Sequence, residues 1–324
     1  MNRNRMNKKR MGRARVLSRA AAGMLAAAMC FQPMTALAGP AGDSSLTSSS
    51  SNAGPGGGSG SSNSGSTGSS GGSTSVSNGG VSAVTSGLGV YRVTENEGIG
   101  AIARGVDVSY WQQNVNWSQV ASDNVQFAML ATRFRGNVDP FFAMNAANAS
   151  QAGLRLGAYI YSYATSVEMA QQEADFVLNL IKDYPISFPV VFDAEDANTL
   201  GTLTQSQVSD VINAFCKRIQ DAGYYPMVYA NEYWIANKID MSKISYDIWV
   251  AKYQQKYTYS KTSMWQASNT GSVKGVNGNV DIDYLYKDYT QIIPGNTWRT
   301  IAGNRYYYQN HVMRGSTMVR IGTI

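Results

Sequence analysis

Residues 190–196 read VVFDAED, three apolar residues that lead directly into a cluster of three acids. An apolar run this short is typical of a buried β-strand. Because side chains alternate along a strand, Asp193 and Glu195 are expected to point to one side, while Val190 and Phe192 point to the other. The stretch therefore predicts a strand whose outer face is apolar and whose end carries two neighbouring carboxylates.

Similar short runs recur along the chain and alternate with longer amphipathic segments. Helical patterns are found at 140–152, 166–183 and 204–222, where Thr204 is a possible N-cap and Gly223 ends the last pattern. Eight strands with fewer helices predict an irregular (β/α) barrel of mainly parallel strands over residues 101–290. An open doubly wound sheet is the alternative, but no Gly-rich phosphate-binding motif follows any strand. The predicted strands are 103–109, 126–132, 154–163, 188–195, 225–231, 246–253, 263–268 and 279–285.

The N-terminal 38 residues have the three-part layout of a secretory signal peptide. A basic head is followed by the apolar run AAAGMLAAAMCF (20–31) and by QPMTALA, so we expect cleavage after Ala38 and a secreted or cell-wall location. A retained membrane anchor is less consistent with the pattern, because the run is shorter than the roughly 20 residues that span a bilayer. No stable membrane insertion is therefore expected after cleavage.

Residues 39–100 are expected to form a disordered Gly/Ser-rich linker. The segment contains runs such as GPGGGSGSSNSGSTGSSGGSTS, which offer little apolar surface to bury. We expect it to act as a flexible tether without a site of its own.

Charge, cysteine and histidine content exclude several functions. Eight of the 27 basic residues lie within the first nineteen positions, and the remaining 19 are outnumbered by 21 acids, so the basic balance does not indicate nucleic-acid binding. Without Cys30, Cys216 is the only thiol, and no internal disulfide is expected. His311 is the only histidine, which excludes Ser-His-Asp and Cys-His catalysis in the barrel. We expect neither a metal nor a cofactor.

Four acids are expected to meet at the carboxyl-end rim of the barrel. Asp107 ends the first strand and Asp281 lies on the last, and these strands are neighbours if the barrel closes. They would join Asp193 and Glu195 there, and paired carboxylates raise each other's pKa, so one can act as a general acid. Asp283 shares a face with Asp281, and which of the two reaches the mouth stays open. The alternative is that each acid is a strand-end carboxylate held by a backbone amide or by Arg133.

Aromatic and amide side chains follow the same predicted strand ends. Sugar rings stack on aromatic faces, and their hydroxyls bind amides and carboxylates, so this mixture indicates a carbohydrate cleft. Core packing is the alternative for Tyr159 and Trp249, whereas Trp265 and Gln266 are the stronger candidates for sugar contact. The expected substrate-binding residues are Tyr159, Tyr161, Tyr229, Trp249, Trp265 and Gln266.

Several motifs together resemble the glycoside hydrolase family 25 muramidases, which are lysozymes that cut bacterial peptidoglycan. The motifs are GVDVSYWQ near the start, FDAE in the middle, and WQ followed by GNVDIDYLY, with MVYAN and IWVAKY between them. The resemblance covers residues 104–289 and implies an irregular α/β barrel. It also implies hydrolysis of the β-1,4 bond between N-acetylmuramic acid and N-acetylglucosamine. By this resemblance Glu195 is the general acid, Asp193 assists it, and Asp107 and Asp281 complete the set of catalytic residues.

The chain departs from the family pattern at two places. Many members carry a Lys-Ala-Thr-Glu-Gly run after the second strand, where this chain reads ATRFRG, and a basic residue there is expected to alter the charge of the cleft. The family's common glycine after the first Trp-Gln is Gln113 in this chain. Neither departure involves the four acids.

The C-terminal residues 291–324 contain WRTIAGNRYYYQNHVM (298–313), which resembles one unit of an aromatic cell-wall-binding repeat. Two short strands around Gly303 and Asn304 predict a hairpin. A lone hairpin is only marginally stable, and such repeats usually bind their ligand between adjacent copies, so we expect a single copy to pack against the barrel. Binding of wall polymer by this unit is the alternative.

Peptidoglycan is the expected partner, and the protein is expected to be a monomer. Two other functions stay open at the level of sequence: a non-catalytic wall-binding protein on the same scaffold, and a chitinase-like glycosidase, which also uses acids at the end of a barrel strand.

Overall fold

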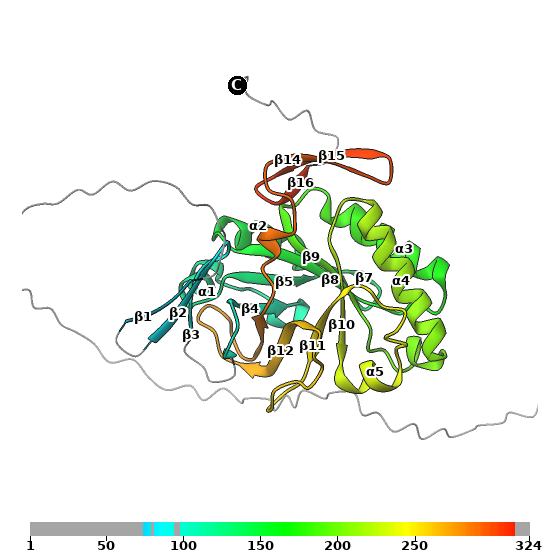
Figure 1. Cartoon of the computed structure of the whole chain (residues 1–324), viewed down its shortest axis with the longest axis horizontal. Helices are drawn as coiled ribbons and strands as arrows, with labels where there is room; N and C mark the ends of the chain where they lie inside the picture. Colours follow the sequence, from blue (N-terminus) through cyan, green and yellow to red (C-terminus); the bar gives the residue numbers. More distant parts are fainter. Residues whose placement is uncertain (1–73, 79–80, 94–97, 315–324) are drawn as a thin grey trace, which may run out of the picture. The chain divides into compact units, whose positions relative to one another are not determined.

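The computed structural model describes residues 74–78, 81–93 and 98–314 (Figure 1). The predicted signal peptide (1–38) and the first part of the predicted linker lie outside these residues. Within the described ranges, no helix is both long enough and apolar enough to cross a bilayer.

Eight strands form a closed barrel, as the sequence predicts. The order around the barrel is β10-β11-β12-β13-β4-β5-β8-β9, with β9 pairing back to β10. The strands are β4 (Ala103–Val108), β5 (Phe127–Ala131), β8 (Arg155–Tyr161), β9 (Ile186–Asp193), β10 (Pro226–Asn231), β11 (Asp247–Ala251), β12 (Thr262–Gly271) and β13 (Val280–Leu285). This closure rules out the open doubly wound sheet.

One strand runs against the others. β13 pairs antiparallel with both β12 and β4, whereas the remaining strands are parallel to their neighbours. The start of β13 therefore lies at the rim where the parallel strands end. An acid near the beginning of β13 can thus face acids at the ends of β4 and β9.

The three predicted helices are present, and two short ones were not predicted. α2 (Phe142–Gln151), α3 (Val167–Ile181) and α4 (Gln205–Asp221) match the amphipathic patterns. Thr204 caps α4 in a capping box, and Gly223, with φ +91°, follows its C-cap. α1 (Trp117–Ser122) and α5 (Glu232–Asn237) have six residues each, too few for a periodic pattern to be visible. Three single-turn 3₁₀ segments complete the helical structure of the described residues, namely η2 (Tyr110–Gln112), η3 (Leu200–Thr202) and η4 (Tyr289–Gln291).

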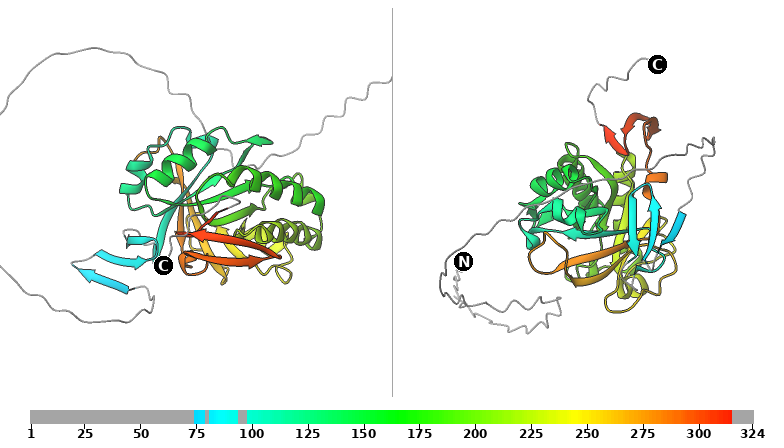
Figure 2. Two further views of the ribbon diagram at one scale, coloured as in Figure 1. Left: turned by 90° about the horizontal axis from the view of Figure 1, so that it is seen from above. Right: turned by 90° about the vertical axis from the view of Figure 1, so that its left-hand side faces the viewer.

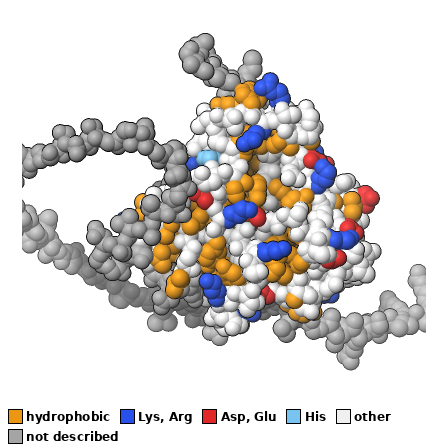
Figure 3. Space-filling model, in the orientation of Figure 1, with side chains coloured by type: hydrophobic (Ala, Val, Ile, Leu, Met, Phe, Trp, Pro, Cys, Tyr) orange, Lys and Arg blue, Asp and Glu red, His pale blue; other side chains and the backbone are white. Residues whose placement is uncertain are grey.

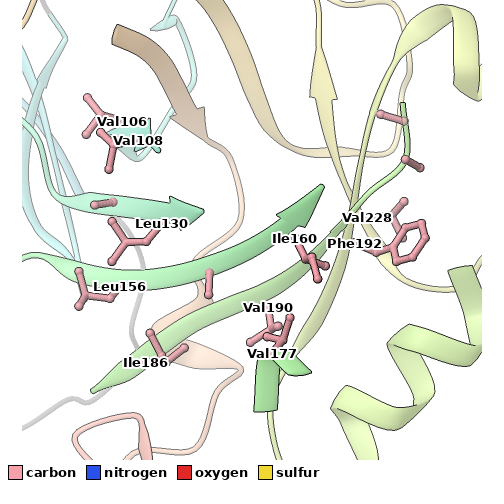
Figure 4. Close-up of a cluster of buried hydrophobic side chains, with 14 of the residues drawn as sticks. Val106, Val108, Leu130, Leu156, Ile160, Val177, Ile186, Val190, Phe192 and Val228 are labelled. Atoms are coloured by element: carbon pink, nitrogen blue, oxygen red, sulfur yellow. The ribbon is translucent and has the colours of Figure 1, made fainter. Parts of the chain in front are cut away.

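Alternating side chains divide the apolar core into two layers. Val190 and Phe192 of β9 belong to the layer outside the barrel, together with Val177 of α3 (Figure 4). Val191 belongs to the separate cluster inside the barrel, with Phe127 and Phe188. Helices α3 and α4 pack side by side over the outer layer (Figure 2). The apolar outer face predicted from VVFDAED is therefore confirmed.

The linker prediction is wrong for its last part. Residues 74–93 include three antiparallel strands, β1 (Thr74–Asn78), β2 (Val81–Ser86) and β3 (Gly89–Val93). The backbone of Arg92 exchanges two hydrogen bonds with the Asn124 side chain, and the Tyr91 ring is fully buried. The physical reason is composition, because VSAVTSGLGVYRV contains β-branched residues and a buried tyrosine that a Gly/Ser tether lacks.

The C-terminal residues form a three-stranded antiparallel sheet rather than a simple hairpin. Its strands are β14 (Thr297–Ile301), β15 (Asn304–Gln309) and β16 (Val312–Arg314). Tyr306 donates a hydrogen bond to the Asp221 carbonyl, and Tyr308 donates one to the Gly223 carbonyl. Tyr308 is 2% exposed and belongs to the cluster inside the barrel. The expected packing of this tail against the barrel is confirmed, at the end opposite the acids.

We expect Tyr308→Ala to lower the free energy of unfolding by about 3–5 kcal/mol, because it removes a buried aromatic ring and its hydrogen bond. Tyr307 is the matched control, since it is the adjacent residue on the other face of β15 and contacts Trp298. Tyr307→Ala should cost about 1 kcal/mol or less. Urea denaturation followed by tryptophan fluorescence measures both variants. Equal losses would show that the tail does not support the barrel.

Candidate active site

Asp107 and Asp281 face each other across the seam that closes the barrel. Asp107 lies in β4, Asp281 lies in β13, and the two residues are direct partners in the antiparallel ladder. Directly opposed residues in such a ladder have Cα atoms about 4.5–5.5 Å apart. Asp283 lies one inward position further along β13, opposite Gly105, and is fully buried. The question of which acid reaches the mouth is thereby answered, because Asp281 is half-buried at the rim and Asp283 lies deeper.

The third and fourth acids lie at the end of β9, on the opposite side of the barrel. Asp193 is the last residue of this strand and is 5% exposed, whereas Glu195 follows it and is half-buried. One carboxylate oxygen of Asp193, Oδ1, is buried without a hydrogen-bond partner among the described residues. A buried acceptor in this state is costly unless something donates to it.

Gln266 connects the two sides of the barrel mouth. Its Nε2 donates to Asp107 Oδ2 at 2.7 Å. Its Oε1 accepts two phenol hydrogen bonds, from Tyr229 at 2.8 Å and from Tyr253 at 2.7 Å. The amide is therefore held in one orientation, and the predicted sugar-binding glutamine also positions an acid.

Burial and neighbouring negative charge raise the pKa of all four acids. Burial, together with the charge of Asp196, raises the pKa of Glu195 to about 7. Burial and the charge of Glu195 raise the pKa of Asp281 to about 7. Because the charge of Glu195 acts on Asp281, the protonation of these two groups is linked. The site therefore holds an exchangeable proton at the pH where a general acid works best.

The pKa values of the more deeply buried acids, Asp107, Asp193 and Asp283, are raised further above their ordinary values. Burial and the charges of Asp281 and Asp283 raise the pKa of Asp107 well above its ordinary value, although the hydrogen bond from Gln266 opposes this. Burial and the charge of Asp281 raise the pKa of Asp283 in the same way, opposed by the hydrogen bond from Trp249 Nε1 at 3.0 Å. Burial and the charge of Glu195 raise the pKa of Asp193.

The structure brings the predicted tyrosines to the acids in three different ways. Tyr229 is 7% exposed and donates to Gln266, so it supports the site from within. Tyr161 donates to Asp196 Oδ2 at 3.1 Å. Tyr159 is half-buried beside Trp249, and burial together with the charges of Asp107, Asp281 and Asp193 raises its pKa. The exposed part of Tyr159 and Tyr161 is available to a ligand.

Two predicted sugar contacts are wrong. Trp249 is 1% exposed inside the barrel and packs edge-on against Tyr229, with ring centroids 4.9 Å apart. Trp265 is also 1% exposed, but it lies on the outer face, where it packs against Tyr257 and Tyr284. Neither indole can stack on a sugar in the mouth. Adjacent residues of a strand face opposite sides, and the register of β12 is regular through Trp265 and Gln266, so only one of the two can face the mouth.

Sequence reasoning missed the roles of Asp196 and Tyr253. Asp196 Oδ1 accepts from the backbone N–H groups of Asn198 and Thr199, so it shapes the loop after β9 while its charge acts on Glu195. The third acid of VVFDAED was a visible signal for it. Tyr253 follows β11, and nothing in its local sequence indicates that it reaches Gln266.

The two departures from the family pattern have structural counterparts. Arg133 forms an ion pair of 2.6 Å with Glu173, and both side chains are largely buried. It holds none of the four acids, so the part of the alternative that names Arg133 is wrong. A backbone hydrogen bond is present at Asp281. Gln113 has φ +50° and ψ −119°, a conformation that glycine adopts without strain. The backbone conformation at this position therefore explains why glycine is common here in the family.

Comparison with known proteins identifies the family to which the chain belongs. Residues 106–276 match the model of the glycosyl hydrolases family 25. The chain belongs to this family. It is therefore a glycoside hydrolase of a lysozyme-type family. The match contains all of the described active-site residues except Asp281 and Asp283, which follow it.

Relatives agree with the assignment. The chain is 31% identical to the uncharacterized protein YegX of Escherichia coli K12 over 189 residues, covering 55% of this chain and 68% of YegX. It is 30% identical to lysozyme M1 of Streptomyces globisporus over 195 residues, covering 55% and 66% of the two chains. The CTP1L endolysin structure has a TM-score of 0.52 at 25% identity, covering 60% of this chain and 70% of that one. A family 25 hydrolase from Bacillus anthracis has a TM-score of 0.51 at 22% identity, covering 58% and 90%, which shows a common fold.

No group of three or more His, Cys, Asp or Glu side chains in the described ranges is arranged to hold a metal ion. The acids of the mouth are spread over opposite strands, and their raised pKa values fit proton transfer. On the face drawn in Figure 3, acidic side chains appear only as separate spots.

We expect Glu195→Gln to stabilise the protein at pH 8 and to leave its stability unchanged at pH 4. The folded-state pKa of Glu195, about 7, lies above its ordinary value of 4.5. The folded state thus binds the extra proton between these values, and wild-type stability falls as pH rises through this window. The gain at pH 8 should be on the order of 2 kcal/mol. Thermal unfolding at both pH values measures it.

Glu168→Gln is the control, because this glutamate lies on the surface at the start of α3 and its pKa is lowered. It should give no gain at pH 8. A pH-independent effect of Glu195→Gln would contradict a buried, protonated carboxyl.

Proposed function

We propose that this protein is a secreted muramidase that hydrolyses the β-1,4 bond between N-acetylmuramic acid and N-acetylglucosamine in bacterial peptidoglycan. Glu195 is the general acid and Asp193 assists it. The observation that carries the proposal is the pairing of these two side chains at one strand end, one protonated near neutral pH and the other with a buried, unpartnered oxygen. Family membership and the relation to lysozyme M1 support the choice of substrate.

In the first step Glu195 transfers its proton to the glycosidic oxygen as the bond from that oxygen to C1 breaks. Positive charge then develops on C1 and the ring oxygen. Asp193, Asp107 and Asp281 lie around the same mouth, so the partial negative charge of their carboxyl oxygens favours this transition state. General acid catalysis of this kind contributes about 10²–10⁴-fold.

In the second step we favour participation of the substrate's own N-acetyl group. Its carbonyl oxygen bonds to C1, and the unpartnered Oδ1 of Asp193 accepts the hydrogen bond of the acetamido N–H. Water then attacks C1, the bond from the acetamido oxygen to C1 breaks, and a water proton returns to the Glu195 carboxylate. Direct attack by a carboxylate is the other route for a two-acid site. The position of Asp193 beside Glu195 on one strand end favours the assisted route.

We expect Glu195→Gln to lower kcat on peptidoglycan by about 10²-fold or more, because the amide cannot donate the proton. Asp193→Asn should lower kcat by about 10²-fold while the protein stays folded. Release of reducing ends from purified walls measures turnover, and mass spectrometry identifies the reducing-end sugar. N-acetylmuramic acid at the reducing end is the expected product.

Two outcomes would replace this function. A protein that pellets with walls and releases no reducing ends is a wall-binding protein on a hydrolase scaffold. Activity on chitin that exceeds activity on peptidoglycan identifies a chitinase-like enzyme. Normal turnover by Glu195→Gln would assign the proton donor to another residue.

The pH profile of kcat/KM provides an independent measure. Because the proton donor must be protonated, we expect activity to fall as pH rises above about 7, the value to which the pKa of Glu195 is raised. Asp281→Asn removes the charge paired with Glu195 and should move this alkaline limb to lower pH. An unmoved limb would show that the two carboxyls do not share their titration.

The proposal also covers the location of the protein and the function of its C-terminal sheet. Export through the signal peptide brings the enzyme to its insoluble substrate, and we propose a monomer with no cofactor. For the C-terminal sheet we propose a structural function, because Tyr306 and Tyr308 are bonded to the barrel. Removal of the predicted signal peptide is checked by N-terminal sequencing of the exported protein.

A further inference from the structure

A group of aromatic side chains lines the rim next to Asp107. Tyr110 and Trp111 follow β4, and Phe134 comes from the short hairpin of β6 (Arg133–Phe134) and β7 (Asn137–Val138). The rings of Tyr110 and Phe134 are stacked, with centroids 4.1 Å apart and planes at 17°. Trp111 stands edge-on to Phe134, with centroids 5.6 Å apart and planes at 88°. The group is therefore an ordered surface.

Trp111 is unusually exposed for a residue in such a group. It is 49% exposed, although its neighbour Gln112 is buried and donates to the Asn279 carbonyl just before β13. Large aromatic residues at the surface are characteristic of binding sites. An exposed indole held on a firmly bonded turn offers a flat, apolar platform.

Arg135 occupies the tip of the hairpin. Arg135 and Gly136 have φ values of +49° and +82°, which are typical of the two-residue turn that joins tightly paired strands. Glycine or asparagine is the usual first residue of this turn, and a longer side chain carries backbone strain. The Arg135 guanidinium lies 5.1 Å from the centre of the Phe134 ring, and no carboxylate of the described residues forms an ion pair with it.

The hairpin is fixed to the acidic mouth. The Tyr110 N–H donates to Asp139 Oδ2 at 2.7 Å, and the Asp139 N–H donates to the Thr132 carbonyl at 3.0 Å. Thr132 in turn donates to the carbonyl of Tyr159. Burial and the charge of Asp107 raise the pKa of the Tyr159 phenol. Tyr110 follows Asp107 by three residues, so their Cα atoms are at most about 11 Å apart. The aromatic surface is therefore continuous with the mouth.

We propose that Trp111, Phe134 and Arg135 form a subsite for the peptide stem of a muropeptide, with Arg135 pairing with a stem carboxylate. The inference rests on the proposed function and identifies the part of the substrate that this rim recognises. In intact peptidoglycan the lactyl carboxyl of N-acetylmuramic acid is joined to the stem as an amide, so the carboxylates that a guanidinium can pair with belong to the stem. The mouth itself is rich in acids, and an anionic stem therefore needs a cation beside it. Trp111 packs against the sugar or the apolar part of the same unit.

The test uses the full-length protein and two substrates. One is peptidoglycan freed of anionic accessory polymers. The other is the same glycan after an amidase has removed its stems and the lactyl carboxyls that this exposes have been converted to amides. We expect Arg135→Gln to lower the ratio of kcat/KM between stem-bearing and stem-free glycan about tenfold, as one partly exposed charge-assisted contact would. The wild-type ratio should also fall between about 0.01 M and 1 M salt, since screening shortens from roughly 30 to 3 Å. Arg135→Lys should restore part of the ratio.

Arg305 is the matched control. Its guanidinium lies 4.8 Å from the centre of the Trp298 ring in the C-terminal sheet, so it is a similar cation–aromatic pair away from the mouth. Arg305→Gln should leave the ratio at the wild-type value. Trp111→Ala should raise KM on both substrates, because the platform contacts more than the charge.

Two results would overturn the subsite. An unchanged ratio in Arg135→Gln, with normal turnover of both substrates, would refute stem recognition and leave the proposed hydrolase function intact. Absence of turnover of either substrate by the wild-type protein would refute the hydrolase function, and the subsite with it.

Discussion

The seam between β4 and β13 is the feature on which the site depends. It places Asp107 and Asp281 directly opposite each other, with Asp283 at the next inward position. Like charges directly opposed in a sheet are destabilising. The barrel can close over them because Gln266 and Trp249 donate to the two inner acids and because burial keeps part of the set protonated. Stability is thus reduced at the place where we propose that the chemistry occurs.

The apolar layers and the tail supply stability elsewhere. The outer layer joins the barrel strands to α3 and α4, and the inner cluster fills the barrel below the acids. Tyr308 from the C-terminal sheet belongs to this inner cluster, so residues more than a hundred positions beyond Asp193 help to hold the end of the barrel opposite the acids. A sheet that resembles a binding repeat is therefore part of the barrel's own packing.

Most of the fold could be predicted from the sequence, because it follows from local patterns. Strand positions, the long helices and the cap at Thr204 depend on periodicity and on single residues, and they are confirmed. The antiparallel direction of β13 could not be predicted, since pairing direction depends on contacts between distant segments. Asp281 nevertheless reaches the mouth, because the start of an antiparallel strand and the end of a parallel one share the same rim.

The same distinction between local patterns and contacts of distant segments decides which site residues could be predicted. The four acids could be found because each stands at a strand end or start, and Asp193 follows the strict alternation of β9. Trp265 was misplaced because it was grouped with its neighbour Gln266, although side chains alternate along a strand. Gln266 faces the mouth, and the indole therefore faces outward. The hydrogen bond from Tyr253 to Gln266 joins two residues after different strands, and no local pattern encodes it.

The orientation of Gln266 explains how an acidic mouth can keep distinct roles for its carboxyls. Its Oε1 accepts from both Tyr229 and Tyr253, so its Nε2 must donate, and the acceptor it meets is Asp107. A donor held in place opposes the rise in the pKa of Asp107, but burial and the charges of Asp281 and Asp283 still raise that pKa well above its ordinary value. Burial and the charge of Glu195 raise the pKa of Asp281 to about 7. The carboxyls of the mouth thus differ in the hydrogen bonds and in the neighbouring charges that each one meets, and Glu195, the proposed proton donor, is one whose pKa is raised to about 7.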